Sequence, residues 1–220
     1  MDFASILREV SVLALPVLFA ITLHEAAHGY VARHFGDPTA WAAGRISLNP
    51  LRHIDPVGTI LVPLVVYFTT ALAGQGFLFG WAKPVPVNFS RLRHPKRDML
   101  WVAAAGPAAN LVMAILWIMV ANVSGTVPAG GVAEWFYAMA EKGILINVIL
   151  MVLNLFPLPP LDGGRIAVSL LPNPYAYHFA RIEPYGLMIL VVLLVTGVLG
   201  ALLWPLVVLT TRLLLTLFAV

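Results

Sequence analysis

A histidine-rich motif stands at the end of a long uncharged stretch of the sequence. Residues Val10–Leu23 carry no charge, and His24, Glu25 and His28 follow directly. Two histidines four residues apart on a helix lie about 40° apart around its axis, so both rings face the same way. Two imidazoles on one face suit Zn²⁺, and Glu25 between them is placed for general-base chemistry. The alternative is a polar cap where a helix meets the membrane interface.

The composition excludes a soluble domain. Of 220 residues, 60% are hydrophobic and 10% are charged, and the mean hydropathy is +0.91. Several stretches approach the roughly 20 apolar residues that cross a bilayer. We therefore expect one membrane-embedded domain over residues 1–220. Its expected fold is an all-α polytopic bundle of about five to six transmembrane helices in the lipid bilayer.

Charge and cysteine content narrow the classes of partner and of metal site. The formal net charge of +3 fits an asymmetry between the loops of a membrane protein, and we expect no nucleic-acid partner. The sequence has no cysteine, which excludes thiol catalysis and thiolate metal sites. Any metal must then be bound by histidine and carboxylate ligands.

Hydropathy divides the chain into apolar segments and connecting stretches. The apolar segments are expected at about 5–35, 57–73, 99–120, 143–156, 186–203 and 205–220, the last two forming the C-terminal transmembrane helices within 184–220. Residues 44–48 alternate loosely, which indicates a short strand, and residues 74–88 contain glycines and prolines that favour extended chain. The aromatic residues of the Gly- and Pro-containing stretch 122–138 indicate a membrane interface.

Asp162 is the natural third metal ligand. A catalytic zinc usually takes three protein ligands and keeps a fourth position for water. Asp162 ends an apolar segment beside Gly163 and Gly164, which allow a sharp turn that could aim its carboxylate inward. The alternative is an Asp-Gly turn at the membrane surface. His53 is either a polar loop residue or a group near the metal.

Convergence of these ligands constrains the topology. His24 and His28 lie near the end of the first apolar segment, and Asp162 lies at the end of the segment 143–156. They can share a metal only if the chain makes no net crossing between residues 36 and 98. The core 5–165 should therefore contain a re-entrant unit at about 57–90, because a single span at 57–73 would separate the ligands. Its non-helical part needs hydrogen-bond partners within the protein.

The distribution of basic residues predicts the orientation in the cell membrane. On this topology ten basic residues fall on the metal side and two, Arg8 and Lys142, fall opposite. The ten are Arg33, Arg45, Arg52, Lys83, Arg91, Arg93, Lys96, Arg97, Arg165 and Arg181. This bias places the metal site on the cytoplasmic side.

Three motifs resemble those of the site-2 protease family of intramembrane zinc metalloproteases, in a small bacterial form without PDZ or CBS domains. They are His24-Glu25-Ala26-Ala27-His28, Gly106-Pro107-Ala108-Ala109-Asn110 and Asn154-Leu155-Phe156-Pro157-Leu158-Pro159-Pro160-Leu161-Asp162-Gly163-Gly164. The resemblance implies one Zn²⁺ bound by His24, His28 and Asp162. It also implies that Glu25 is the catalytic base, and that Asn110 and Asn154 act near the substrate or the zinc-bound water. The alternative for both asparagines is an interhelical hydrogen bond.

The function implied by the resemblance is hydrolysis of peptide bonds within or next to transmembrane segments, as in regulated intramembrane proteolysis. The substrate would be a transmembrane protein, for example an anti-sigma-factor-like or other single-span protein. Two rival classes share the motifs: a catalytically silent zinc-binding scaffold and a metal transporter. Intact Glu25 argues against the first, and the apolar segments offer few polar residues for the second.

Overall fold

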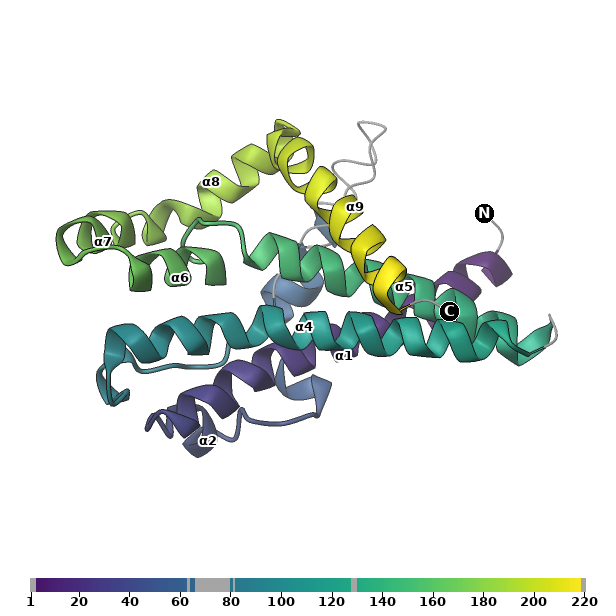
Figure 1. Cartoon of the computed structure of the whole chain (residues 1–220), viewed down its shortest axis with the longest axis horizontal. Coiled ribbons are helices and arrows are strands. Elements are labelled where there is room, and N and C mark those ends of the chain that lie inside the picture. Colours follow the sequence, from purple (N-terminus) through teal and green to yellow (C-terminus); the bar gives the residue numbers. More distant parts are fainter. Residues whose placement is uncertain (1–2, 63, 66–79, 81, 128–129, 219–220) are drawn as a thin grey trace.

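The computed structural model describes residues 3–62, 64–65, 80, 82–127 and 130–218. The described residues form helices and loops and contain no strand (Figure 1). The long helices are α1 (Phe3–His34), α4 (Pro95–Gly125), α5 (Gly131–Asn154) and α9 (Val198–Phe218). The shorter ones are α2 (Thr39–Ala42), η1 (Pro50–Arg52), η2 (Pro56–Leu61), η3 (Phe89–Arg91), α6 (Asp162–Leu170), α7 (Asn173–Ala180) and α8 (Glu183–Val195).

The helix lengths confirm an all-α polytopic membrane protein. Within the described residues, α1, α4, α5 and α9 are each long and apolar enough to cross a membrane. Helices α7 and α8 meet at 62° and add a fifth span if they are counted together. Most of the apolar segment predicted at 57–73 lies outside the described residues.

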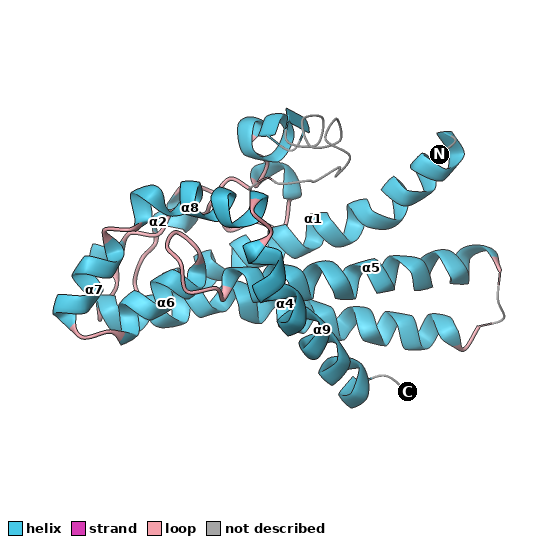
Figure 2. Ribbon diagram, turned by 90° about the horizontal axis from the view of Figure 1, so that it is seen from above, coloured by secondary structure: helices cyan, strands magenta, loops and turns pink. Residues whose placement is uncertain are grey.

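Small residues let α1, α4 and α5 approach closely (Figure 2). Ala20 and Ala32 of α1, Ala114 of α4 and Ala140 of α5 are completely buried. Lipid tails are as apolar as leucine, so helices in a bilayer associate mainly through close van der Waals packing, which small residues favour. The three helices thereby pack closely enough for side chains of all three to contact one another inside the bundle.

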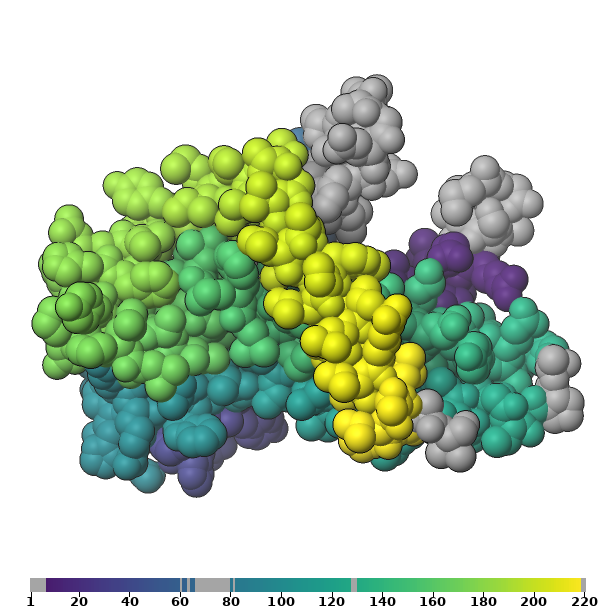
Figure 3. Space-filling view, turned by 45° about the horizontal axis from the view of Figure 1, so that its top comes forward, coloured from purple at the N-terminus to yellow at the C-terminus, as the bar shows by residue number. Residues whose placement is uncertain are grey.

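Helix α9 covers one side of this core. It lies diagonally across the outer face in the space-filling view (Figure 3) and packs against α5 and α4. Val207 and Leu214 of α9 are buried in the same apolar cluster as Ile118 and Val148. This contact shields the middle of α5 from lipid on that side.

The C-terminal end of α1 meets the segment that leads into α4. Gly36 adopts a left-handed conformation with φ 104°, and the Asp37 amide donates to the Ala32 carbonyl at 2.9 Å, a common way to end a helix. The Arg93 amide donates to the Phe35 carbonyl at 3.0 Å. The chain thus leaves α1 and enters α4 at the same end of the bundle. The re-entrant unit at 57–90 stays a prediction, because residues 66–79 lie outside the described residues.

Ion pairs join α1 and α5 at the opposite end of the bundle. Arg8 lies 3.2 Å from Glu134, and Glu9 lies 3.9 Å from Lys142. All four side chains are exposed. The first turns of α5 therefore run beside the polar N-terminal part of α1. The apolar part of α5 begins after these turns.

Two expected boundaries are wrong. The stretch 122–138 continues the helices, since α4 extends to Gly125 and α5 begins at Gly131 rather than near Gly143. Hydropathy marks the part of a helix that suits lipid, and a helix continues into water wherever its backbone stays hydrogen-bonded. Near the C-terminus, the helices α8 and α9 are separated at Gly197 (φ 77°) and not at Pro205, which lies inside α9. Proline is tolerated in membrane helices because neighbouring groups satisfy the freed carbonyl.

The strand suggested at residues 44–48 is also absent from the described structure. The Gly44 amide donates to Trp41 and the Arg45 amide to Ala40, both at 2.9 Å. These bonds close a turn after α2, with Gly44 at φ 63°. The turn therefore uses two of the five amides that a strand over 44–48 would offer for pairing.

We expect single cysteines at Arg52 and Arg93 to be labelled from the same side of the membrane, and one at Lys142 from the other side. The protein has no native cysteine, so each variant reports on one position. The measurement is labelling by a membrane-impermeant thiol reagent in oriented vesicles. Labelling of positions 52 and 93 from opposite sides would contradict the shared end described above.

Candidate metal centre

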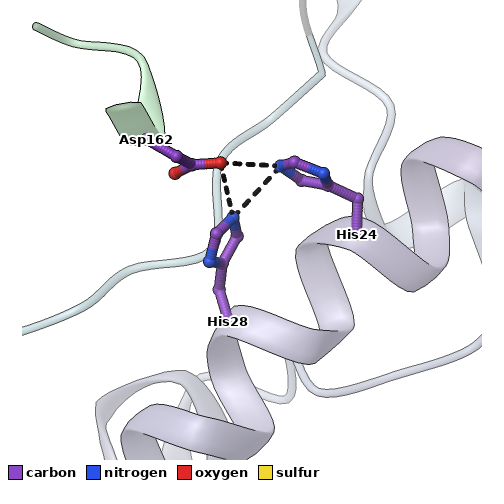
Figure 4. A group of neighbouring side chains, drawn as sticks. All are labelled: His24, His28 and Asp162. Atoms are coloured by element: carbon purple, nitrogen blue, oxygen red, sulfur yellow. Dashed lines mark hydrogen bonds and ion pairs between the residues drawn. The ribbon is translucent and has the colours of Figure 1, made fainter. Parts of the chain in front are cut away.

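Two histidines of α1 and one aspartate of α6 converge inside the protein (Figure 4). His24 Nε2 and His28 Nε2 lie 3.1 Å apart. Asp162 Oδ2 lies 3.2 Å from the first and 3.3 Å from the second. All three side chains are buried. Among the described residues, these three form the one group of His, Asp or Glu side chains whose ligand atoms lie close enough together to share a metal ion.

The second nitrogen of each imidazole fixes which nitrogen faces the centre. His28 Nδ1 lies 2.7 Å from the Val102 carbonyl, which can only accept a hydrogen bond. His24 Nδ1 lies 2.6 Å from Asn110 Oδ1. Both Nδ1 atoms must therefore carry the hydrogen in the neutral rings, so both Nε2 atoms turn a lone pair toward the centre. Such second contacts are usual for metal-binding histidines.

Neutral histidines leave this cluster without a donor at its centre. Two imidazole lone pairs and the carboxylate face one another, and buried Asp162 Oδ2 has no hydrogen-bond partner. A tetrahedral zinc with bonds of about 2.1 Å separates its ligand atoms by about 3.4 Å. The observed separations of 3.1, 3.2 and 3.3 Å are close to this value. The residues present therefore fit a zinc ion that keeps one position open.

The two glycines after Asp162 act by close packing. Neither is left-handed; both belong to α6. A Cβ on Gly163 would lie 2.2 Å from the Leu155 carbonyl oxygen, and one on Gly164 would lie 2.2 Å from the Pro159 nitrogen. The expectation that they permit a sharp turn is therefore wrong. They let the start of α6 press against the chain that leaves α5, which brings Asp162 to the histidines.

Gly106 of α4 provides the space for the two imidazoles. A Cβ there would lie 2.4 Å from His28 Nε2 and 2.5 Å from His24 Nε2. Gly106 is part of the Gly-Pro-Ala-Ala-Asn motif, but the sequence alone did not predict this role for it. The signal was a glycine inside an apolar helix, where it costs stability unless packing requires it.

A buried pair of asparagines orients His24. Both hydrogens of the Asn110 amide are used, in bonds to the Ala20 carbonyl at 3.2 Å and to Asn147 Oδ1 at 3.0 Å. Asn110 Oδ1 is thereby directed at His24. The Asn147 amide donates in turn to the Gly143 carbonyl at 2.8 Å. Asn147 was not among the residues predicted from the sequence, although a polar amide side chain in the most apolar part of α5 was a usable signal.

Glu25 lies beside the cluster without joining it. It is half-buried, and its Oε2 accepts a hydrogen bond from the Val85 amide at 2.7 Å. It is not in the group of side chains close enough to share an ion. A carboxylate next to the ligands but outside the ligand set is placed for proton transfer.

The structure does not bring the remaining candidates to the cluster. Buried His53 lies in a loop, with Nε2 2.9 Å from the Ser47 carbonyl. The Asn154 amide donates to the Leu150 carbonyl of its own helix at 2.9 Å. The carboxylate of Glu183, in the neighbouring part of the chain, lies 3.6 Å from Arg165 and is not in the cluster. A role for Asn154 near the substrate or the zinc-bound water, and one for His53 near the metal, stay predictions.

Replacement of Gly106 by alanine should lower the metal content of the purified protein by at least about tenfold, because the new methyl group would overlap both Nε2 atoms and displace the imidazoles. The matched control is Gly125→Ala in the same helix, where a Cβ meets nothing within 4 Å. Elemental analysis of both variants makes the measurement. Full metal content in Gly106→Ala would show that the histidines do not depend on this contact.

Comparison with known proteins gives the same chemistry. The model of peptidase family M50 matches residues 122–197. The protein YwhC of Bacillus subtilis, whose name places it among zinc metalloproteases, is 36% identical over 196 residues, covering 88% of this chain and 84% of that protein. Rip2 of Mycolicibacterium smegmatis, named in the same way, is 34% identical over 184 residues, covering 83% and 66%. No solved structure matches the chain.

The extent of the first of these likenesses decides the family. It covers 88% of this chain and 84% of the Bacillus subtilis protein, at 36% identity. The convergent histidines and aspartate supply the ligand set that a zinc metalloprotease needs. The chain belongs to peptidase family M50, the site-2 protease family of membrane zinc metalloproteases.

Proposed function

We propose that this protein hydrolyses peptide bonds within or next to the transmembrane segments of membrane-protein substrates. The observation that carries the proposal is the position of the metal ligands. His24 and His28 belong to a helix of membrane-spanning length, and their rings are buried against α4. A peptide bond can reach such a site only from a segment that itself enters the membrane or its interface.

His24, His28 and Asp162 would hold the zinc, and Glu25 would move the proton. Zinc, when bound, polarises a scissile carbonyl and lowers the pKa of water toward about 7. Glu25 accepts a proton from the attacking water at its second carboxylate oxygen and later donates it to the leaving amine nitrogen. Asn110 orients His24 rather than touching the substrate, because both of its amide hydrogens and its oxygen are already engaged.

The segment 82–88 is proposed to hold the substrate. A helical substrate must unwind before its peptide bonds are accessible, and an extended chain can then pair with it as an added strand. In the described structure, the Val87 amide and the carbonyls of Val85 and Val87 have no hydrogen-bond partner. These groups lie close to Glu25, since the Val85 amide contacts its carboxylate. In the segment 44–48, the amides of Gly44 and Arg45 are already used in the turn after α2, so segment 82–88 is the better candidate for this role.

The metal end is proposed to face the cytoplasm. The loops and helix ends near His34 and Pro95 carry most of the lysine and arginine residues, and such residues favour the cytoplasmic side. Water would then reach the zinc from that side. The substrate would be a single-span membrane protein, of the kind for which an anti-sigma-factor-like protein is an example.

Glu25→Gln should abolish cleavage of a tagged single-span membrane protein while the purified protein keeps about one zinc. General-base catalysis contributes about 10²–10⁴-fold, and a group outside the ligand set can change without loss of metal. Glu134→Gln is the control, because Glu134 is exposed at the opposite end of the bundle. Activity and zinc are both measured.

Other results of this experiment would assign a different role to Glu25 or to the whole protein. Loss of zinc together with activity would make Glu25 a ligand and overturn its assignment as the base. Wild-type protein that binds zinc but cleaves nothing would be a silent scaffold, and the proposed function would then be wrong.

A further inference from the structure

The contact between Glu25 and segment 82–88 joins residues far apart in the sequence. The Val85 amide donates to Glu25 Oε2 at 2.7 Å, and the Val85 side chain is buried. A hydrogen bond from an amide to a carboxylate is stronger than one between neutral groups. No hydrogen bond to the other oxygen, Oε1, is found among the described residues.

The segment is fixed on the N-terminal side of Val85. The Lys83 amide donates to the His53 carbonyl at 2.9 Å. Arg45 Nη2 donates to the Lys83 carbonyl at 2.7 Å. Buried His53 therefore connects two loops through its backbone, and Arg45 holds the peptide group two residues before Val85.

A second anchor lies on the C-terminal side. The Asn88 amide donates to Asp37 Oδ2 at 2.6 Å, and Thr39 donates to the other oxygen. Burial raises the pKa of the Asp37 carboxyl group, but these hydrogen bonds outweigh burial and lower it. Asp37 is thus an ionised acceptor that ties segment 82–88 to the end of α1.

The sequence of the segment stiffens the backbone between these anchors. Val85 stands between Pro84 and Pro86. Proline fixes its own φ and pushes the preceding residue into an extended conformation. Neither proline has an amide hydrogen, so Val85 supplies the one amide donor between Lys83 and Val87. The position and direction of this donor are therefore fixed by the segment itself, independently of its contact with Glu25.

We propose that the backbone amide of Val85 is a positioning group for the general base. Glutamate has three rotatable side-chain bonds, and an unrestrained carboxylate would sample many positions. The amide holds Oε2 and leaves Oε1 to accept the proton of the attacking water. This inference rests on the proposed function, in which Glu25 is the base. Arg45, His53 and Asp37 contribute indirectly, because they hold the segment that carries the amide.

The contact itself can be measured without turnover or metal. Hydrogen exchange of the peptide covering segment 82–88 reports on few amides because two of its residues are proline. In Glu25→Ala the Val85 amide should exchange at least about tenfold faster than in wild type, since its acceptor is gone. Glu25→Gln is the matched control, because its side-chain carbonyl still accepts. It should exchange more slowly than Glu25→Ala. Unchanged exchange in Glu25→Ala would overturn the proposal.

The role of the contact is tested by Val85→Pro against Val85→Ala. Both lose the valine side chain. Proline removes the amide hydrogen while suiting the extended backbone that its neighbours impose, and alanine keeps the hydrogen. The assay is cleavage of a tagged single-span membrane protein. We expect kcat of Val85→Pro to be at least about tenfold below that of Val85→Ala, with KM within about threefold and equal zinc content and thermal stability.

Two results would contradict the positioning role. Equal kcat in the two variants would mean that the amide is not needed. A parallel fall in kcat and in zinc content or stability would mean that the contact only maintains the fold. Failure of the wild type to cleave any substrate would refute the proposed function instead, and the exchange measurement would still decide whether the contact exists.

Discussion

Lone pairs that face one another in a buried space are the constraint on which this structure depends. The Nε2 atoms of His24 and His28 and a carboxylate oxygen of Asp162 lie within 3.1–3.3 Å of one another. A cation between the three groups relieves their repulsion, and the geometry suits zinc. The protein must therefore bring α1 and α6 together at one point and hold each ligand in a single orientation.

Glycines that allow close approach make that convergence possible. Gly106 lets the imidazole side chains lie directly on the backbone of α4, and Gly163 and Gly164 let α6 lie against the backbone that follows α5. The buried amides of Asn110 and Asn147 then connect α1, α4 and α5 by hydrogen bonds. Apolar burial gives little preference for one arrangement of helices in lipid, so close packing and buried polar contacts must specify it.

Much of the site could be predicted from the sequence because its residues stand out against apolar surroundings. His24, Glu25, His28 and Asp162 are ionisable groups in or beside apolar segments, and the requirement that the ligands meet gave the return of the chain between α1 and α4. Asn147 and Gly106 were missed because their roles depend on what a different helix places opposite them. Helix boundaries were also imprecise. Hydropathy indicates which residues suit lipid. The start of α5 at Gly131 and the end of α8 before Gly197 depend instead on backbone conformation.

The bound zinc of three purified proteins tests the central claim most directly. Wild type and Glu183→Ala should each bind about one zinc per chain, and Asp162→Ala should lose most of it, because two imidazoles alone form an incomplete site. Glu183 is a suitable control because it is a carboxylate in the neighbouring part of the chain that pairs with Arg165. Full zinc content in Asp162→Ala, or its loss in Glu183→Ala, would contradict the metal centre described for α1 and α6.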